Sequence, residues 1–130
     1  MIERVSSGTA WEPLVGYSRA VAAGDFVFVS GCTSVEGAAV VHSGDPYRQT
    51  RQAIRNVETA LTAVGCTLAD VVRTRLFVTD IGCWEDIGRA HGEAFGDIRP
   101  ATSMVQVSAL IDPALLVEVE AVAYRPGVGR

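Results

Sequence analysis

Hydrophobic residues recur every three or four positions across residues 46–64, which is the spacing of an amphipathic helix. The stripe consists of Tyr47, Thr50, Ile54, Val57, Leu61 and Val64. Asp45 and Pro46 suit the N-cap and first helical positions, and Gly65 suits a helix stop. A second helix is predicted over residues 84–95, where acidic residues at the start complement the helix dipole.

Shorter segments rich in β-branched residues predict strands. Residues 21–30 contain a turn signal at Gly24, which predicts a meander of two strands, and Gly31 interrupts or bends the second strand. Residues 35–41 are a candidate for another strand, residues 70–78 form a further one, and two strands end the chain. This order of elements indicates an α+β fold with both helices packed on one face of the sheet.

Charged residues share one face of two of these strands. In residues 116–124 apolar side chains alternate with Glu118 and Glu120, which therefore lie on one face roughly 7 Å apart. Arg73 and Arg75 likewise share one face of their strand. Because unpaired buried charge is costly, we predict cross-strand pairing that satisfies all four groups.

Composition limits the classes of protein to consider. The chain has 130 residues and is nearly half apolar, which suits one globular domain over residues 1–130. The net charge of −4 gives no electrostatic reason to expect nucleic-acid binding. No apolar run approaches the roughly 20 residues of a membrane span, and the N-terminus lacks the layout of a secretion signal. We therefore expect a cytoplasmic protein without a membrane partner.

The side chains that hold common cofactors are missing or isolated. There is no lysine, so a lysine Schiff base, including one with pyridoxal phosphate, cannot form. The three cysteines form no metal-type pair, and their odd number argues against a complete disulfide framework. Neither histidine has the neighbours of a metal motif, and the glycines form no phosphate loop. We expect no metal and no other cofactor.

Several short segments carry a family signature when taken in order. They are Gly16-Tyr17-Ser18, Phe28-Val29-Ser30-Gly31, Gln49-x-x-Gln52-x-x-x-Asn56-Val57, Arg75-Leu76-Phe77-Val78-Thr79-Asp80, Pro100-Ala101-x-Ser103 and Glu118-Val119-Glu120-Ala121. Together they resemble the Rid family, the reactive intermediate deaminases also called YjgF-type proteins. The resemblance implies a single-domain, chorismate-mutase-like mixed β-sheet and a homotrimer whose centre is lined by the charged sheet face. It also implies clefts between subunits that bind a small molecule, and hydrolysis of reactive enamines and imines.

Thr102 departs from the family pattern. Family deaminases usually read Pro-Ala-Arg-Ser or Pro-Ala-Arg-Thr, and Thr102 stands where that arginine would bind the substrate carboxylate through two hydrogen bonds. A hydrogen bond to a charged group contributes about 1.5–3 kcal/mol, so its loss would weaken carboxylate recognition about ten- to a hundredfold or more. The resemblance therefore implies the fold more firmly than the usual 2-imino acid activity.

Glu118 is the candidate catalytic residue. It aligns with the carboxylate that positions the attacking water in family deaminases, and a carboxylate there could act as general base or orient water toward an iminium carbon. The structural alternative is an ion pair with Arg73 or Arg75, and the two roles are compatible. Glu120 is interpreted mainly as structural.

Four further positions are candidate ligand contacts near that carboxylate. Tyr17 and Ser30 could supply hydroxyl groups, with packing or turn roles as the alternative. Cys32 stands where glutamine is common in the family, so it is either a nucleophile or redox sensor or a small apolar residue at a strand end. Backbone groups near Cys32 and Val105 are expected to hold the ligand.

Two arginines could replace the lost positive charge. Arg89 lies on the second predicted helix, where many family members have asparagine, and its alternative is a solvated helix face. Arg99 precedes Pro100, which biases it toward extended geometry. Its alternatives are anion binding and a loop or interface ion pair.

Two functions stay open, and a third is weighed against them. The first is a small-molecule hydrolase of the enamine/imine deaminase type with altered substrate preference. The second is a non-catalytic or regulatory ligand-binding trimer. The third is ribonuclease activity, suggested by the family's older endoribonuclease label and disfavoured by the acidic balance and the absence of lysine. We favour the hydrolase because Glu118, Tyr17 and Ser30 are retained together.

Overall fold

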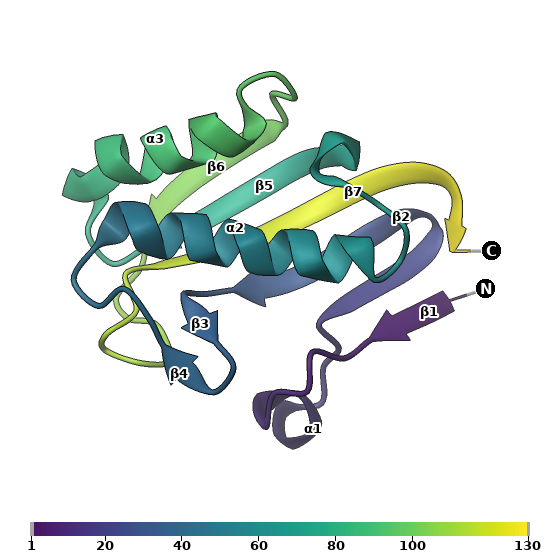
Figure 1. The fold of residues 1–130 in the computed structure, drawn as a ribbon, viewed down its shortest axis with the longest axis horizontal. Coiled ribbons are helices and arrows are strands. Elements are labelled where there is room, and N and C mark those ends of the chain that lie inside the picture. The colour runs from purple at the N-terminus through teal and green to yellow at the C-terminus, as the bar shows by residue number, and fades with distance from the viewer. Residues whose placement is uncertain (1, 130) are drawn as a thin grey trace.

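A five-stranded sheet is the central element of the computed structural model, which describes residues 2–129. The strand order is β1-β2-β7-β5-β6 (Figure 1), and neighbouring strands are antiparallel except β5 and β6, which run parallel. The strands are β1 (Ile2–Val5), β2 (Ala20–Cys32), β5 (Val71–Val78), β6 (Ala101–Gln106) and β7 (Val117–Gly129). A separate small hairpin pairs β3 (Val35–Glu36) with β4 (Ala39–Val40).

Two long helices cover one face of this sheet. They are α2 (Pro46–Thr62) and α3 (Trp84–Phe95), which lie side by side across it (Figure 1). The apolar residues of β7 that alternate with the two glutamates are at most 2% exposed beneath this layer: Val117, Val119, Ala121 and Ala123. The predicted α+β fold with both helices on one face is confirmed. We call the opposite face, which carries Glu118 and Glu120, the open face.

The boundaries of α2 follow from its sequence. The Asp45 side chain accepts a hydrogen bond from the Arg48 N–H at 2.9 Å, and Pro46 is the first helical residue, as predicted. The helix ends at Thr62, shortly before Gly65, whose φ of +80° an L side chain rarely adopts. Two short 3₁₀ helices lie farther along the chain, at Leu68–Asp70 and Ile81–Cys83.

Buried polar side chains of α2 fasten the helix to the rest of the fold. Gln49 is fully buried, and its amide donates to the Ala114 carbonyl and accepts from the Leu116 N–H, both at 2.8 Å. Asn56 donates to two backbone carbonyls in the segment after β2, at 2.8 and 2.9 Å. Because buried polar groups need partners, these amides hold α2 against the segment that leads into β7 and the segment that follows β2.

The N-terminal third differs from the predicted meander. β2 is a single strand of 13 residues, and Gly24 lies within it instead of at a turn between two strands. The pairing of β2 with β7 shifts register between Gly24 and Phe26 and again between Val29 and Cys32. Such irregularities bend a strand without ending it, so the second one confirms that the chain bends near Gly31. The candidate strand at 35–41 is a hairpin of two-residue strands.

A short helix that the hydrophobic pattern did not predict, α1 (Trp11–Val15), is organised by Glu12. The Glu12 side chain is 4% exposed and accepts hydrogen bonds from the Ser7 hydroxyl at 2.5 Å and the Thr9 hydroxyl at 2.8 Å. Its backbone carbonyl accepts from the Tyr17 N–H at 3.0 Å. Burial alone would raise the pKa of Glu12, but hydrogen bonds led by that of Ser7 outweigh it and lower this pKa to about 2.

We predict that Glu12→Gln destabilises the protein by about 1–3 kcal/mol at pH 7, since charge-assisted hydrogen bonds are lost. The folded pKa is lowered from 4.5 to about 2, so this stabilisation is present above pH 4.5 and is lost as the pH falls through about 2. Urea unfolding of the native protein and of Glu12→Gln, from pH 7 to pH 2, measures this difference in the free energy of unfolding. The exposed Glu3→Gln in β1 is the control, and a difference that stays constant with pH would contradict the assignment.

Candidate functional site

Glu118 packs against a strand position that has no side chain. It lies half-buried on the open face of β7, between the buried residues Val117 and Val119. A Cβ added to Gly31 of β2 would lie 2.4 Å from Glu118 Oε2 and 2.8 Å from Glu118 Cγ. Any larger residue at position 31 would therefore push the carboxyl group away. The structure therefore brings the end of β2 and Glu118 together.

Arg19, which the sequence patterns did not single out, places its guanidinium at the Gly31 side of this contact. Its Nη1 donates to the Gly31 carbonyl at 2.6 Å, lies 3.3 Å from the Ser30 carbonyl and is 3.5 Å from Cys32 Sγ. Its Nη2 donates to the Tyr17 hydroxyl oxygen at 3.2 Å. The signal that could have found it is its place directly after Gly16-Tyr17-Ser18. We call the set Tyr17, Arg19, Ser30, Gly31, Cys32 and Glu118 the Glu118 corner.

The Glu118 corner disfavours the charged form of its carboxylate. Burial raises the pKa of Glu118, the negative charge of Glu120 raises it further, and the positive charge of Arg19 partly offsets both. Glu118 forms no ion pair among the residues that the structure describes. A carboxylate with a raised pKa is a stronger base than an ordinary glutamate.

Two predicted ligand contacts, Ser30 and Tyr17, form hydrogen bonds within the protein at the Glu118 corner. The Ser30 hydroxyl donates to the Ser18 carbonyl at 2.7 Å, which fastens the segment after α1 to the end of β2. The Tyr17 hydroxyl accepts from Arg19, and the guanidinium carbon of Arg19 is 5.5 Å from the centre of the Tyr17 ring. Both residues are linked through Arg19 to the backbone beside Glu118, and the Ser30 hydroxyl already donates its proton to a protein carbonyl.

Cys32 also belongs to the corner, but its environment does not favour reactivity. The side chain is 3% exposed and is part of the hydrophobic core beneath the helices. Burial raises the pKa of the Cys32 thiol, and the opposing effect of Arg19 does not cancel this. Because the thiolate is the reactive form, this geometry favours the apolar strand-end alternative over a nucleophile or redox sensor.

The predicted neutralisation of four charges is only half correct. Arg75 pairs with Glu120, with Nη2 to Oε1 at 2.8 Å, and the two residues are register partners on β5 and β7. The register places Phe77 opposite Glu118, whereas Arg73 turns to Ser103 of β6 and donates to its hydroxyl at 3.0 Å. The strand register therefore leaves Glu118 without an arginine on its neighbour β5.

Thr102 lies away from the Glu118 corner within one chain. Its hydroxyl oxygen is 2.7 Å from Oγ1 of Thr74, a fully buried residue on the helix-covered side of the sheet. The Thr102 hydroxyl also donates to the Pro100 carbonyl at 3.1 Å. Thr74 pairs with Thr102 in register, whereas Phe77 pairs with Glu118. Two strand spacings and three residues along the strand separate the two positions by roughly 14 Å. One chain does not bring them into one site.

Val105 does lie in the same row as Glu118. It is the register partner of Phe77 on β6, and Phe77 is the partner of Glu118 on β7. Val105 is 46% exposed at the edge of the sheet. Its backbone therefore lies on the row of Glu118 but two strands away, at roughly 10 Å.

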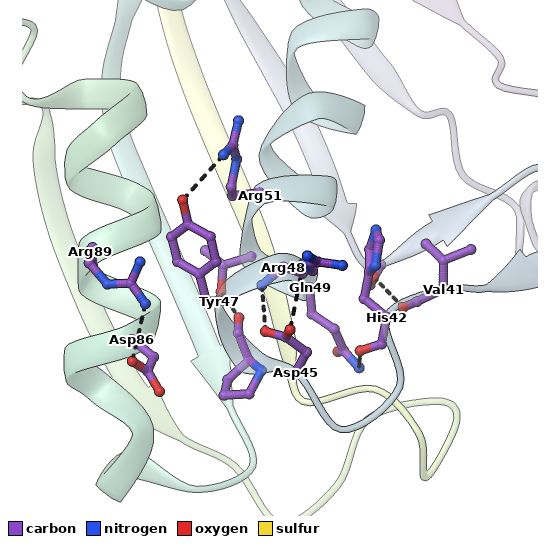
Figure 2. Close-up of polar contacts among 12 residues, drawn as sticks. Val41, His42, Asp45, Tyr47, Arg48, Gln49, Arg51, Asp86 and Arg89 are labelled. Carbon is purple, nitrogen blue, oxygen red and sulfur yellow. Dashed lines mark hydrogen bonds and ion pairs between the residues drawn. The ribbon is translucent and has the colours of Figure 1, made fainter.

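Arg89 belongs to the helix layer and not to the open face. It extends from α3 toward α2, where its guanidinium carbon lies 3.9 Å from the centre of the Tyr47 ring (Figure 2). It also pairs with Asp86 at 3.4 Å, and Arg51 donates to the Tyr47 hydroxyl at 3.2 Å. Within one chain the sheet separates Arg89 from Glu118, so Arg89 does not restore a charge to this corner.

Arg99 does not adopt the extended geometry that was predicted from the following proline. Its φ is +57°, in the left-handed region, and its N–H donates to the Phe95 carbonyl at 2.8 Å. The turn that ends α3 imposes this conformation, because the bond satisfies a carbonyl at the helix C-terminus. The side chain is exposed at this turn.

The open face carries a shallow hollow beside the corner. Its volume is about 220 Å³, and it is lined by residues of β2, β5 and β7 that include Phe28, Ser30, Arg73, Arg75 and Glu120. Ligand pockets usually measure about 300–1,000 Å³, so this hollow alone does not enclose a ligand. Within residues 2–129 no three His, Cys, Asp or Glu side chains are grouped as metal ligands, and no helix is long and apolar enough to cross a membrane.

Comparison with known proteins places this chain in a family. The family model described as Endoribonuclease L-PSP matches residues 7–125. The crystal structure of Rv2704 from Mycobacterium tuberculosis, a member of the YjgF/YER057c/UK114 family, is similar with a TM-score of 0.86 and 54% identity, covering 95% of this chain and 99% of that one.

Two curated relatives extend the comparison. The uncharacterized protein SCO2049 of Streptomyces coelicolor is 41% identical over 127 residues, 98% of this chain and 95% of that protein. The 3-aminoacrylate deaminase RutC of Acinetobacter baylyi is 35% identical over 113 residues, 86% of this chain and 89% of that protein. The chain therefore belongs to the endoribonuclease L-PSP family, which comprises the YjgF, Rid and RutC proteins.

We predict that Glu118→Gln stabilises the protein against thermal unfolding at pH 8. The folded pKa of Glu118 is raised, so its carboxyl is neutral and without cost below pH 4.5, and its ionisation costs stability as the pH rises through the folded pKa. The gain in Tm should therefore be larger at pH 8 than at pH 4. Glu120→Gln, which loses the Arg75 ion pair, is the control and should show no such gain. A lower Tm for Glu118→Gln at pH 8 would contradict the raised pKa.

Proposed function

We propose that the protein is a small-molecule hydrolase of the enamine/imine deaminase type with altered substrate preference. The observation that carries the proposal is Glu118, a half-buried carboxylate with a raised pKa that pairs with no cation within residues 2–129 and is held against Gly31 beside Arg19. Membership of a family that includes a 3-aminoacrylate deaminase supports the same reaction class, because 3-aminoacrylate is an enamine.

The chemistry needs one base that can later return a proton. The enamine first tautomerises to the imine. Glu118 removes a proton from a water molecule as its oxygen bonds to the imine carbon, and the imine nitrogen takes a proton from solvent, which gives a neutral carbinolamine. Glu118 then passes its proton to the amino nitrogen, the C–N bond breaks to release ammonia, and the hydroxyl oxygen gives its proton to solvent as the carbonyl forms. No oxidant or reductant is required.

The altered preference follows from the hydrogen bonds of Thr102. Burial lowers the pKa of His91, so its ring is neutral near pH 7. The Thr102 hydroxyl donates its proton to the Pro100 carbonyl, so its oxygen is left to accept from Thr74 Oγ1, which is 2.7 Å away and itself lies 2.8 Å from His91 Nε2. In this arrangement the Thr102 hydroxyl offers a ligand only a lone pair. It suits an N–H group, such as an amide or amine, better than a carboxylate.

We propose that the complete site forms between subunits of a homotrimer. Proteins of this family are typically homotrimers. The open face exposes Phe26, Phe28 and Tyr124 by 42–49%, together with the Arg75–Glu120 pair, and a second copy would cover this apolar surface. Glu118 and Thr102 are too far apart to act together within one chain, so a neighbouring copy would supply the Thr102 side of the cleft.

A second function is supported by the same threonine. Loss of the usual anchoring arginine together with an engaged Thr102 hydroxyl is compatible with a non-catalytic ligand-binding trimer. Such a protein would bind enamines or related amides at the Glu118 corner without releasing ammonia. Ribonuclease activity, which the name of the family model suggests, receives no support from a net charge of −4.

We predict that the native protein releases ammonia from freshly generated enamines or imines, and that Glu118→Gln lowers kcat/KM about 10²- to 10⁴-fold, the usual contribution of a general base. Ammonia release on 2-imino acids, 3-aminoacrylate and a 2-imino amide measures it, with Glu120→Gln as the control on the same face. Tight binding of these compounds without any ammonia release would favour the ligand-binding function. RNA cleavage that survives rigorous purification and is lost in Glu118→Ala would favour the ribonuclease.

We predict that Thr102→Arg increases kcat/KM for 2-imino acids at least tenfold over the native protein, since two charge-assisted hydrogen bonds to the carboxylate become possible. Activity on the uncharged 2-imino amide should not rise. Thr102→Val, which removes the hydroxyl without adding charge, is the matched control. Full native activity on 2-imino acids, unchanged in Thr102→Arg, would show that another residue holds the carboxylate.

A further inference from the structure

Arg19 has contacts that fix the backbone beneath Glu118. Its Nη1 is within hydrogen-bond distance of two successive carbonyls, those of Gly31 at 2.6 Å and Ser30 at 3.3 Å. These peptides lie where β2 shifts register against β7. Irregular backbone at such a point lacks the regular ladder partners of a strand. The Arg19 guanidinium supplies hydrogen-bond donors to these carbonyls and so fixes the position of the Gly31 Cα. The Glu118 carboxyl packs against this Cα.

The backbone on both sides keeps Arg19 in place. Its N–H donates to the Val5 carbonyl at 2.8 Å, and its carbonyl accepts from the Ser30 N–H at 2.9 Å. The Ser30 hydroxyl bonds to the neighbouring Ser18 carbonyl at 2.7 Å. The Tyr17 hydroxyl accepts from the other end of the guanidinium. The positive charge is therefore held beside the corner and does not move as it would on a free surface side chain.

The position of the Arg19 charge matters because the other groups that the structure describes around Glu118 supply no positive charge to it. On β7 the nearest ionisable group is Glu120, whose charge is compensated by Arg75 from β5. On β2 it is Cys32, a buried thiol, and the register partner on β5 is the apolar Phe77. Among residues 2–129, Arg19 is thus the cation that acts on the Glu118 carboxylate.

We propose that Arg19 is a positioning residue for Glu118, which holds the Gly31 backbone that receives the carboxyl group and places a positive charge beside this carboxylate. The role deepens the proposed function and rests on it for its catalytic meaning, because water activation needs the ionised form of Glu118. The structural part of the inference involves no substrate and can be tested without one.

Titration of the Glu118 carboxyl by carbon NMR in the full-length protein tests the inference. Arg19→Gln keeps an N–H donor for the Gly31 carbonyl but removes the charge, and it should raise the titration midpoint of Glu118. Arg19→Lys keeps the charge and should leave the midpoint close to the native one. Arg73→Gln is the matched control, since Arg73 lies on the same face but bonds to Ser103, and it should cause no shift. If Arg19→Gln does not fold, Arg19→Met provides the second uncharged variant.

The pH profile of activity gives the functional measurement. In Arg19→Gln, kcat/KM at pH 6 should fall about three- to tenfold, with a smaller loss at pH 9, because a shift of one unit in the pKa of a base changes its ionised fraction up to tenfold. A folded, uncharged variant with an unchanged Glu118 midpoint would overturn the inference. A raised midpoint in a protein without activity on any enamine or imine would instead support the inference and reject the proposed function.

Discussion

The close contact between Glu118 and Gly31 is the constraint on which the site depends. A carboxyl group on a β-strand normally turns to solvent or to a charged neighbour, but here a strand position without a side chain leaves room for it to lie against the backbone. The bend of β2 at this point, the clamp from Arg19 and the tie from Ser30 to Ser18 all serve this arrangement. The N-terminal segment organised by Glu12 delivers Tyr17 and Arg19 to the same place.

The two glutamates of β7 show how register separates structural from chemical roles. Both lie on the open face, yet Glu120 faces Arg75 and forms an ion pair, whereas Glu118 faces Phe77 and forms none with the residues that the structure describes. Burial of the Glu118 carboxylate, offset only in part by the charge of Arg19, raises its pKa and reduces the stability of the fold at neutral pH. Such a cost at one residue, beside a fully compensated neighbour, is typical of functional sites.

Sequence reasoning predicted the elements with strong patterns and failed where tertiary contacts decide. The stripe of α2, its Asp45–Pro46 start and the bounds of α3 were evident from periodicity and capping. The short α1 and β1 were missed, because α1 depends on hydrogen bonds to Glu12 and β1 on pairing with β2. The pairing of Arg73 was wrong because alternation gives the face of a strand but not its register. Arg19 was missed because its role comes from backbone carbonyls eleven and twelve residues away.

The most direct test of the central claim compares two midpoints in the native protein: that of the Glu118 carboxyl in an NMR titration and that of the acid limb of kcat/KM for enamine or imine hydrolysis. If Glu118 is the water-activating base, the two midpoints coincide and both lie above the ordinary value for glutamate. A Glu118 that titrates at its ordinary value, or an acid limb with a different midpoint that persists in Glu118→Gln, would contradict the account.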